Sequence, residues 1–310
     1  MVNKCLSIVV SVYNEEKALN NFFKAFDDIK YSLSWNYELI FVNDGSVDNS
    51  LNLLKEYAQF DENVKIISFS KNYGHEAAMI AGIDHSHGDA VVCMDSDLQH
   101  PLESLNPIID EIEKGYNVVS MVRTENKSAG LFKNITSKIF YKLINKLSNQ
   151  ESFEENASDF FAIDRKVVEV LKSSYRQKIR FLRGFVQNVG FKRTKLSYIA
   201  SDRQGGESHY SIKNLIRLSI NTIVCFSDIP LKLGIFAGGI AALFGVVVLI
   251  YSIFTHNGAP AGYTTLISFN SFMFAIMFVI IGVIGQYISA IYTEIKDKPI
   301  YIVEEMINFK

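Results

Sequence analysis

A long stretch without charged residues places the strongest constraint on how this chain can fold. From Leu233 to Thr293 there is no Asp, Glu, Lys or Arg, although these residues make up 21% of the whole chain. The stretch contains two apolar segments, 231–254 and 265–292, joined by the uncharged loop 255–264. The first would form a helix of about 36 Å at ~1.5 Å per residue, and crossing a hydrocarbon core of ~30 Å takes only about 20 residues. We therefore predict a hairpin of two transmembrane helices, with a hairpin buried in a protein core as the alternative.

Basic residues beside the apolar segments predict how the hairpin is oriented. The loop between the segments has neither Lys nor Arg, whereas basic residues lie on both outer flanks, at Lys213, Arg217, Lys232, Lys296 and Lys298. Because such residues favour the cytoplasmic side, we expect a multi-pass protein of the plasma membrane with both termini in the cytoplasm. The predicted organisation is a cytoplasmic domain at 1–207, an interfacial juxtamembrane helix at 208–230, transmembrane helices at 231–254 and 265–292, and a cytoplasmic tail at 293–310.

Strand-like and helix-like segments alternate in the first half of the chain. Short apolar runs predict strands at 6–12, 37–42, 64–69, 90–94, 117–122 and 157–163. Amphipathic or capped segments predict helices at 15–30, from about 47 onward, and at 76–85, 101–114 and 164–171. This alternation with short turns predicts an α/β fold, a Rossmann-like and mostly parallel sheet with helices on both faces.

Two turns in this half refine the prediction. A dinucleotide-binding fold would carry Gly-x-Gly-x-x-Gly after its first strand, but residues 13–16 read Tyr-Asn-Glu-Glu, which argues against a nicotinamide-dependent dehydrogenase. After the second strand, Gly45 permits a tight turn, and Ser46 or Asp48 could cap a helix that begins near Val47.

Two carboxylates follow the fourth predicted strand. Asp95 and Asp97 come directly after the apolar run 90–94. Ligands of open α/β sheets bind at the carboxyl ends of the strands, and Mg²⁺ and Mn²⁺ prefer oxygen ligands that they share with substrate phosphates. The spacing therefore predicts a metal–diphosphate site, and a solvated acidic turn is the alternative.

Composition excludes several other functions. A net charge of −2 gives no basic field for nucleic acid. Cys5, Cys93 and Cys225 have neither paired nor metal-ligand spacing, which fits a reducing cytosol without disulfides. The six histidines form no metal-ligand pattern either.

The helix predicted at 128–147 carries a lysine stripe that suits either a solvated face or an anionic membrane surface.

Taken together, the motifs resemble the family 2 glycosyltransferases. The likeness is strongest to the polyprenyl-phosphate glycosyltransferases, which include dolichol-phosphate mannose synthase and bacterial undecaprenyl-phosphate glucosyl and N-acetylglucosaminyl transferases. Each motif alone is weak, but their order and spacing, followed by two apolar segments, cover nearly the whole chain. The residues that carry the resemblance are 12–16, 42–46, 70–74, 94–101, 159–160, 180–184 and 205–210.

The resemblance implies a GT-A fold and an inverting, metal-dependent transfer of a sugar from a nucleotide sugar, UDP-glucose or UDP-N-acetylglucosamine, to a polyprenyl phosphate such as undecaprenyl phosphate. It implies that Asp97 and Asp159 are catalytic and that Asp95 and Asp97 bind Mg²⁺ or Mn²⁺. The implied donor-binding residues are Tyr13, Glu15, Asp44, Asp95, Ser96, Gln99, Arg203 and Lys213. The implied acceptor-phosphate residues are Arg123, Lys133 and Ser137.

The chain also departs from the pattern of that family. The family usually has proline where Ser11 stands, often two aspartates where Asn43 and Asp44 stand, and often arginine where Phe161 stands. Residues 177–181 nearly match the Gln-x-x-Arg-Trp motif of processive polysaccharide synthases, but two spans are too few for a polymer channel.

Other activities and partners stay open from the sequence. A membrane-anchored glycosyltransferase acting on a diglyceride or a wall polymer, and a scaffold subunit without activity, are the alternative functions. Glycines in the apolar segments suit helix packing and hence a homo-oligomer. A downstream flippase or a glycosyltransferase that uses the lipid-linked sugar would be further partners, with a final role in cell-envelope glycosylation.

Overall fold

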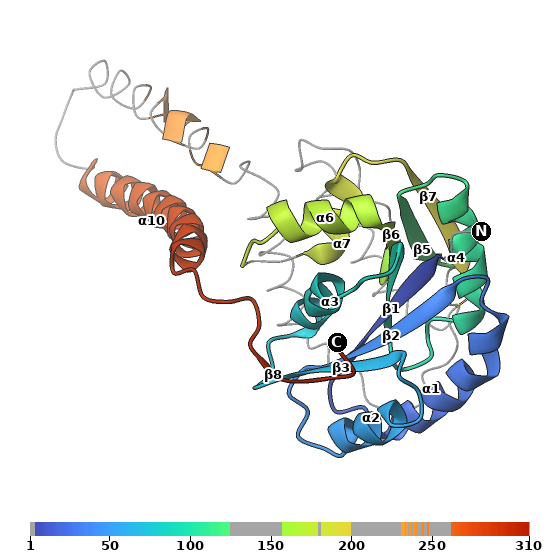
Figure 1. Cartoon of the computed structure of the whole chain (residues 1–310). Coiled ribbons are helices and arrows are strands. Elements are labelled where there is room, and N and C mark those ends of the chain that lie inside the picture. The colour runs from blue at the N-terminus through green and yellow to red at the C-terminus, as the bar shows by residue number, and fades with distance from the viewer. Residues whose placement is uncertain are drawn as a thin grey trace.

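The structure is a computed structural model of the whole chain (Figure 1). It describes residues 4–124, 157–178, 181–199 and 262–309, together with isolated positions between 231 and 247. The helix predicted at 128–147, the interfacial helix predicted at 208–230 and most of the first predicted transmembrane segment lie outside the described residues.

A single eight-stranded sheet forms the centre of the molecule. Its strands are β1 (Cys5–Val12), β2 (Asn36–Asn43), β3 (Val64–Phe69), β4 (Ala90–Asp95), β5 (Val118–Arg123), β6 (Ala157–Asp164), β7 (Arg193–Tyr198) and β8 (Val303–Ile307). They lie in the order β7-β5-β6-β4-β1-β2-β3-β8. Most neighbours are parallel, whereas β6 runs antiparallel to β4 and β5, and β8 runs antiparallel to β3. The predicted α/β fold with a mostly parallel sheet is therefore confirmed.

Helices cover both faces of the sheet (Figure 1). The helices are α1 (Glu16–Ile29), α2 (Ser50–Ala58), α3 (His75–Asp84), α4 (Leu105–Glu113), α6 (Arg165–Ser174), α7 (Leu182–Asn188) and α10 (Gly262–Ile295). Side chains of β1 alternate between the two faces: Ile8 and Val10 pack with α1 and α4, whereas Val9 packs with α3, α6 and α7. This alternation is the period of two expected for a strand that is buried on both faces.

Some helix starts differ from the sequence prediction. The helix expected near Val47 begins only at Ser50. The hydroxyl of Ser46 accepts a hydrogen bond from the Asn14 backbone N–H instead of capping that helix, while Asp48 accepts from the Ser50 N–H. The helix expected from Pro101 starts as a 3-10 turn at Leu102–Ser104 and becomes α-helical in α4.

Three elements were not predicted from the sequence: α7, β7 and β8. Strand β8 lies within residues 293–310, for which the sequence predicts a tail. In the structure this segment returns to the sheet, where β8 extends the edge beside β3. The Asn308 side-chain amide donates to the carbonyls of Ala58 and Val64 and holds the strand in place.

The long helix α10 leads away from the sheet (Figure 1). It includes the second predicted transmembrane segment, and Phe272–Ile295 is long and apolar enough to cross a membrane, with a mean hydropathy of 2.2. None of that stretch is buried against the rest of the protein. Within the described part of the chain it is the one helix that meets these criteria, so the predicted hairpin stays a prediction.

Candidate functional site

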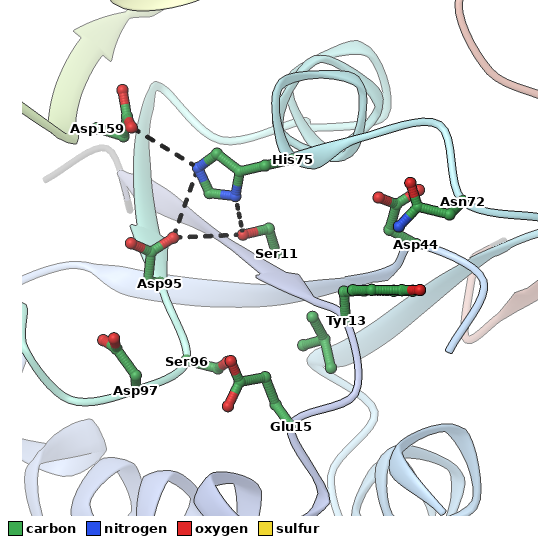
Figure 2. A pocket seen from close by; sticks show the side chains of 11 residues that line it. Ser11, Tyr13, Glu15, Asp44, Asn72, His75, Asp95, Ser96, Asp97 and Asp159 are labelled. Atoms are coloured by element: carbon green, nitrogen blue, oxygen red, sulfur yellow. Dashed lines mark hydrogen bonds and ion pairs between the residues drawn. The ribbon is translucent and has the colours of Figure 1, made fainter. Parts of the chain in front are cut away.

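A polar pocket opens at the carboxyl ends of the central strands (Figure 2). Strand β1 lies between β4 and β2, so the chain order reverses direction at this point, and open α/β sheets bind ligands at such switch points. The pocket has a volume of about 250 Å³. It is lined by Ser11, Val12, Tyr13, Glu15, Asp44, Asn72, His75, Asp95, Ser96, Asp97 and Asp159.

The end of β4 and the loop that follows it bring both predicted metal-binding aspartates, Asp95 and Asp97, into this pocket. Asp97 is only 8% exposed, and its Oδ1 accepts a hydrogen bond from the Gln99 N–H at 3.1 Å. Leu98, between Asp97 and Gln99, has a φ of 58°, which lies in the left-handed region that a bulky residue seldom adopts. Such backbone conformations persist only where the surroundings enforce them, and here the loop folds tightly behind Asp97.

The buried histidine of the same loop supports Asp95 from behind. His100 is 5% exposed and stacks on Phe160, with 4.8 Å between ring centroids. Its Nδ1 accepts a hydrogen bond from the Asp95 backbone N–H at 3.0 Å. A neutral ring that accepts at Nδ1 carries its proton on Nε2, and Nε2 lies 3.9 Å from Asp95 Oδ2. His100 therefore holds the backbone of Asp95 in place and lies beside its carboxylate.

Asp44, at the end of β2, holds the neighbouring loop. Its two carboxylate oxygens accept hydrogen bonds from the backbone N–H groups of Tyr73, at 2.6 Å, and Gly74, at 2.9 Å. The turn after it requires glycine: Gly45 has a φ of +65°, and a Cβ there would lie 2.4 Å from the carbonyl carbon of Lys71. The tight turn predicted at Gly45 is thus confirmed, and it keeps Asn72 at the pocket wall.

His75, the first residue of α3, lies in the middle of the charged groups (Figure 2). Its Nδ1 is 2.8 Å from the Ser11 hydroxyl, and its Nε2 is 3.5 Å from Asp95 Oδ1 and 4.0 Å from Asp159 Oδ2. Burial lowers the pKa of His75, but Asp95 and Asp159 outweigh burial, so this pKa is raised above its ordinary value.

Asp159 projects from β6 toward the same group of residues. Arg183 of α7 approaches from another side, with its Nε 3.8 Å from Asp159 Oδ1. Burial raises the pKa of Asp159, but Arg183 and then His75 outweigh burial, so the pKa of this carboxyl lies below its ordinary value. Asp159 is therefore a carboxylate at neutral pH and a weak proton acceptor.

The pocket suits a divalent cation that arrives with a phosphate ligand. Among the residues that the structure describes, no group of three or more His, Cys, Asp or Glu side chains is placed to hold a metal alone. Asp95 and Asp97 offer carboxylate oxygens to one pocket. Mg²⁺ and Mn²⁺ are commonly held by one or two carboxylates plus water and substrate phosphates, so the residues present fit such an ion.

Most of the predicted site residues that the structure describes meet in this pocket. Tyr13, Glu15, Asp44, Asp95, Ser96, Asp97 and Asp159 line it. Gln99 does not line it and instead donates its backbone N–H to Asp97, and Arg123 lies at the end of β5, outside the lining. Four predicted residues, Lys133, Ser137, Arg203 and Lys213, fall outside the described part of the chain.

Four lining residues are not among the predicted site residues: Ser11, Val12, Asn72 and His75. In the sequence analysis the histidines are considered only as metal ligands, and a histidine that contacts a hydroxyl and faces two carboxylates is therefore missed. Ser11 was noted only as a departure from proline, yet proline could not supply the hydroxyl that contacts His75. The position of His75, directly after a strand-end loop and at a helix start, was the available signal.

Comparison with known proteins shows the family to which the chain belongs. The model of the family described as Glycosyl transferase family 2 matches residues 7–172. The chain therefore belongs to glycosyl transferase family 2 and is a glycosyltransferase, which confirms the family predicted from the sequence motifs.

Two relatives align along nearly the whole chain. An uncharacterized glycosyltransferase of Bacillus subtilis, YkcC, is 40% identical over 96% of this chain and 93% of its own length. The bactoprenol glucosyl transferase of Shigella phage SfII is 34% identical over 97% of both chains. Among solved structures, mannosyl-3-phosphoglycerate synthase from Rubrobacter xylanophilus matches 71% of this chain and 72% of its own, with 14% identity and a TM-score of 0.49.

Proposed function

We propose that this glycosyltransferase transfers a sugar from a nucleotide sugar, UDP-glucose or UDP-N-acetylglucosamine, to a polyprenyl phosphate at the cytoplasmic face of the membrane. The observation that carries the proposal is that Asp95, Asp97 and Asp159 line one pocket at the switch point of the sheet. The full-length similarity to a bactoprenol glucosyl transferase supports the choice of acceptor.

The donor end of the pocket suits a nucleoside diphosphate. Tyr13 is 47% exposed beside the pocket and offers an aromatic face, while Glu15 and Asp44 offer acceptors for sugar hydroxyl groups. Asp95 and Asp97 would hold Mg²⁺ or Mn²⁺, which would neutralise the negative charge of the departing diphosphate. Such an arrangement favours direct displacement, which inverts the configuration of the sugar.

The acceptor end needs no strong base. The second pKa of a phosphate monoester is about 6, so the attacking group is largely dianionic at pH 7. The lowered pKa of Asp159 fits this requirement, because a carboxylate that Arg183 and His75 hold ionised is a poor proton acceptor. We propose that Asp159 orients the reacting groups and assists electrostatically.

Arg123 is the described residue proposed for the acceptor phosphate. It ends β5 opposite Tyr198 of β7. Its Nε is buried and has no hydrogen-bond partner among the described residues. A buried donor without a partner is costly, on the order of 1–3 kcal/mol, and an anionic ligand would satisfy it. Lys133 and Ser137 stay predictions for the same role.

The sheet supports the proposed membrane hairpin. Strands β7 and β8 belong to one sheet, and α10 lies between them in the sequence. If α10 crosses the bilayer, the chain must cross a second time between Tyr198 and Gly262 for both strands to lie on one side. The apolar segment 231–254 would supply that crossing, and flanking lysines favour the cytoplasm for the sheet. The proposed oligomer and flippase partners rest on no described contact.

Transfer by the full-length protein in membranes tests the proposal. Labelled UDP-glucose, UDP-N-acetylglucosamine and GDP-mannose would each be incubated with undecaprenyl phosphate, with Mn²⁺ or with EDTA. We expect a metal-dependent lipid product that mild acid hydrolyses, because the sugar is linked through phosphate, and a β-linkage from the α-linked donor. An acid-stable product would indicate a diglyceride or another hydroxyl acceptor, and a retained α-linkage would exclude a single displacement.

A further inference from the structure

We propose that His75 is a positioning residue that holds Asp159 at a fixed place relative to the metal-binding Asp95, with Ser11 setting the plane of its ring. This inference rests on the proposed function and adds a residue to it. The three side chains that His75 contacts come from three different strands: Ser11 from β1, Asp95 from β4 and Asp159 from β6.

The hydrogen-bonding pattern fixes which edge of the imidazole faces the carboxylates. Nδ1 is engaged by the Ser11 hydroxyl at 2.8 Å, and that hydroxyl also reaches Asp95 Oδ1 at 3.4 Å. Nε2 faces Asp95 Oδ1 and Asp159 Oδ2 at 3.5 and 4.0 Å. Carboxylates only accept hydrogen bonds, so the nitrogen directed at both of them carries a hydrogen.

The position of His75 offsets the repulsion between the carboxylates of Asp95 and Asp159. Two carboxylates that share a pocket repel each other and would turn apart without a donor between them. His75 Nε2 provides one donor that faces both, while Arg183 approaches Asp159 at its other oxygen, Oδ1. The next residue of α3 supports the arrangement, because the side-chain Oε1 of Glu76 accepts a hydrogen bond from the Leu182 backbone N–H and so links α3 to α7.

Two substitutions of His75 test the roles of its two ring nitrogens separately. In His75→Asn the side-chain amide nitrogen takes the place of Nδ1, so the Ser11 contact is retained and the edge facing the carboxylates is lost. In His75→Gln the amide nitrogen takes the place of Nε2. Loss of a residue that orients a metal ligand typically reduces activity about 10- to 100-fold. We expect His75→Asn to lower kcat by that factor with KM for the nucleotide sugar within about threefold, and His75→Gln to recover part of the loss.

Two controls distinguish positioning from general damage. His87 lies outside the pocket and is exposed, so His87→Asn should leave kcat unchanged. In an Asp159→Asn background, His75→Asn should lower kcat much less than it does in the wild type, because its effect passes through the Asp159 carboxylate. A wild-type kcat in His75→Asn, an effect confined to KM, or full additivity with Asp159→Asn would overturn the inference.

A substrate-free measurement keeps this inference separate from the proposed function. Thermal unfolding of Ser11→Ala, His75→Ala and the double variant should show a coupled loss, because each single substitution removes the hydrogen bond between the Ser11 hydroxyl and His75 Nδ1. Additive losses of thermal stability would contradict a hydrogen-bonded unit of Ser11 and His75, even if sugar transfer is normal. Should the wild type transfer no sugar to polyprenyl phosphate, the proposed function fails, while a coupled loss would still support the positioning of His75 by Ser11.

Discussion

Asp44 provides a test of whether a predicted donor-binding residue also builds the pocket. The residue is 2% exposed, and each of its carboxylate oxygens accepts one backbone N–H from the loop that leads into α3. In Asp44→Asn one oxygen remains, so at least one of the two N–H groups loses its acceptor. Hydrogen bonds to charged groups contribute about 1.5–3 kcal/mol, so we expect Asp44→Asn to lower the free energy of unfolding by about that amount.

The assay uses the single tryptophan of the chain. Trp35 is 8% exposed, and its indole N–H donates to Glu113 at 2.9 Å, so its fluorescence reports unfolding of the sheet domain. A loss of 1 kcal/mol lowers Tm by roughly 2–4 °C in a domain of this size. We therefore expect Asp44→Asn to melt about 3–12 °C below the wild type, and Asp44→Ala to melt lower still.

Asp48 offers a matched control for Asp44. Its carboxylate also accepts two backbone N–H groups, those of Glu16 and Ser50, but it is partly exposed and does not line the pocket. Water can replace its bonds, so Asp48→Asn should shift Tm by less than about 3 °C and leave the KM for donor unchanged. A wild-type Tm in Asp44→Asn together with a raised KM would refute the reasoning, because Asp44 would then contact only the nucleoside.

Four further predictions concern the site, the core, the sheet edge and the apolar segments. Asp97→Ala should abolish transfer, while Asp159→Asn should retain measurable turnover in a radiolabel assay; an inactive Asp159→Asn enzyme with normal donor binding would contradict the proposed role. Burial raises the pKa of Glu38, but Lys65, Ser7 and the His87 N–H outweigh burial, so this pKa is lowered. The Tm of the wild type should therefore fall as the pH drops below about 4.5. An equal fall of Tm in Glu38→Gln would exclude Glu38 as the cause. Deleting 300–310 should lower Tm because β3 keeps β2 but loses its pairing partner on the other side, β8. Replacing 231–295 by a short linker should preserve donor hydrolysis and impair transfer to long-chain acceptors. Equal loss of both activities would count against a role of the apolar segments in acceptor access.

Strong periodicity explains which elements were predictable. The strands from β1 to β6 are apolar runs bounded by polar turns, and that pattern predicted these strands and a mostly parallel sheet. The order of the strands and the antiparallel direction of β6 did not follow from it. Strand β8 has the sequence Val-Glu-Glu-Met-Ile, in which two adjacent glutamates interrupt the alternation of apolar and polar residues. Charged side chains are common on edge strands, where they hinder pairing with another chain. Its pairing with β3 depends on a long return through α10, which no local pattern contains.

The pocket likewise contains residues that a local sequence pattern predicts and residues that depend on long-range packing. Asp44, Asp95 and Asp97 follow strands, and parallel strands deliver their carboxyl ends to one edge of the sheet. The contact of His75 depends instead on how closely α3 packs on β1. That distance is set by Gly82, where an added Cβ would lie 2.1 Å from Val9 Cγ1. Such packing emerges only when both elements are in place, so the residue could not be assigned from spacing alone.

The position of β8 after α10 has a consequence for biogenesis. A ribosome finishes β1 to β7 well before it makes β8, so the nascent sheet waits with one side of β3 uncovered. If α10 enters the lipid during translation, the final pairing can form only after insertion has brought the following residues back to the same compartment. Maturation of the enzyme would thus be coupled to correct membrane integration, and a chain that failed to integrate would present an open β-edge to chaperones and proteases.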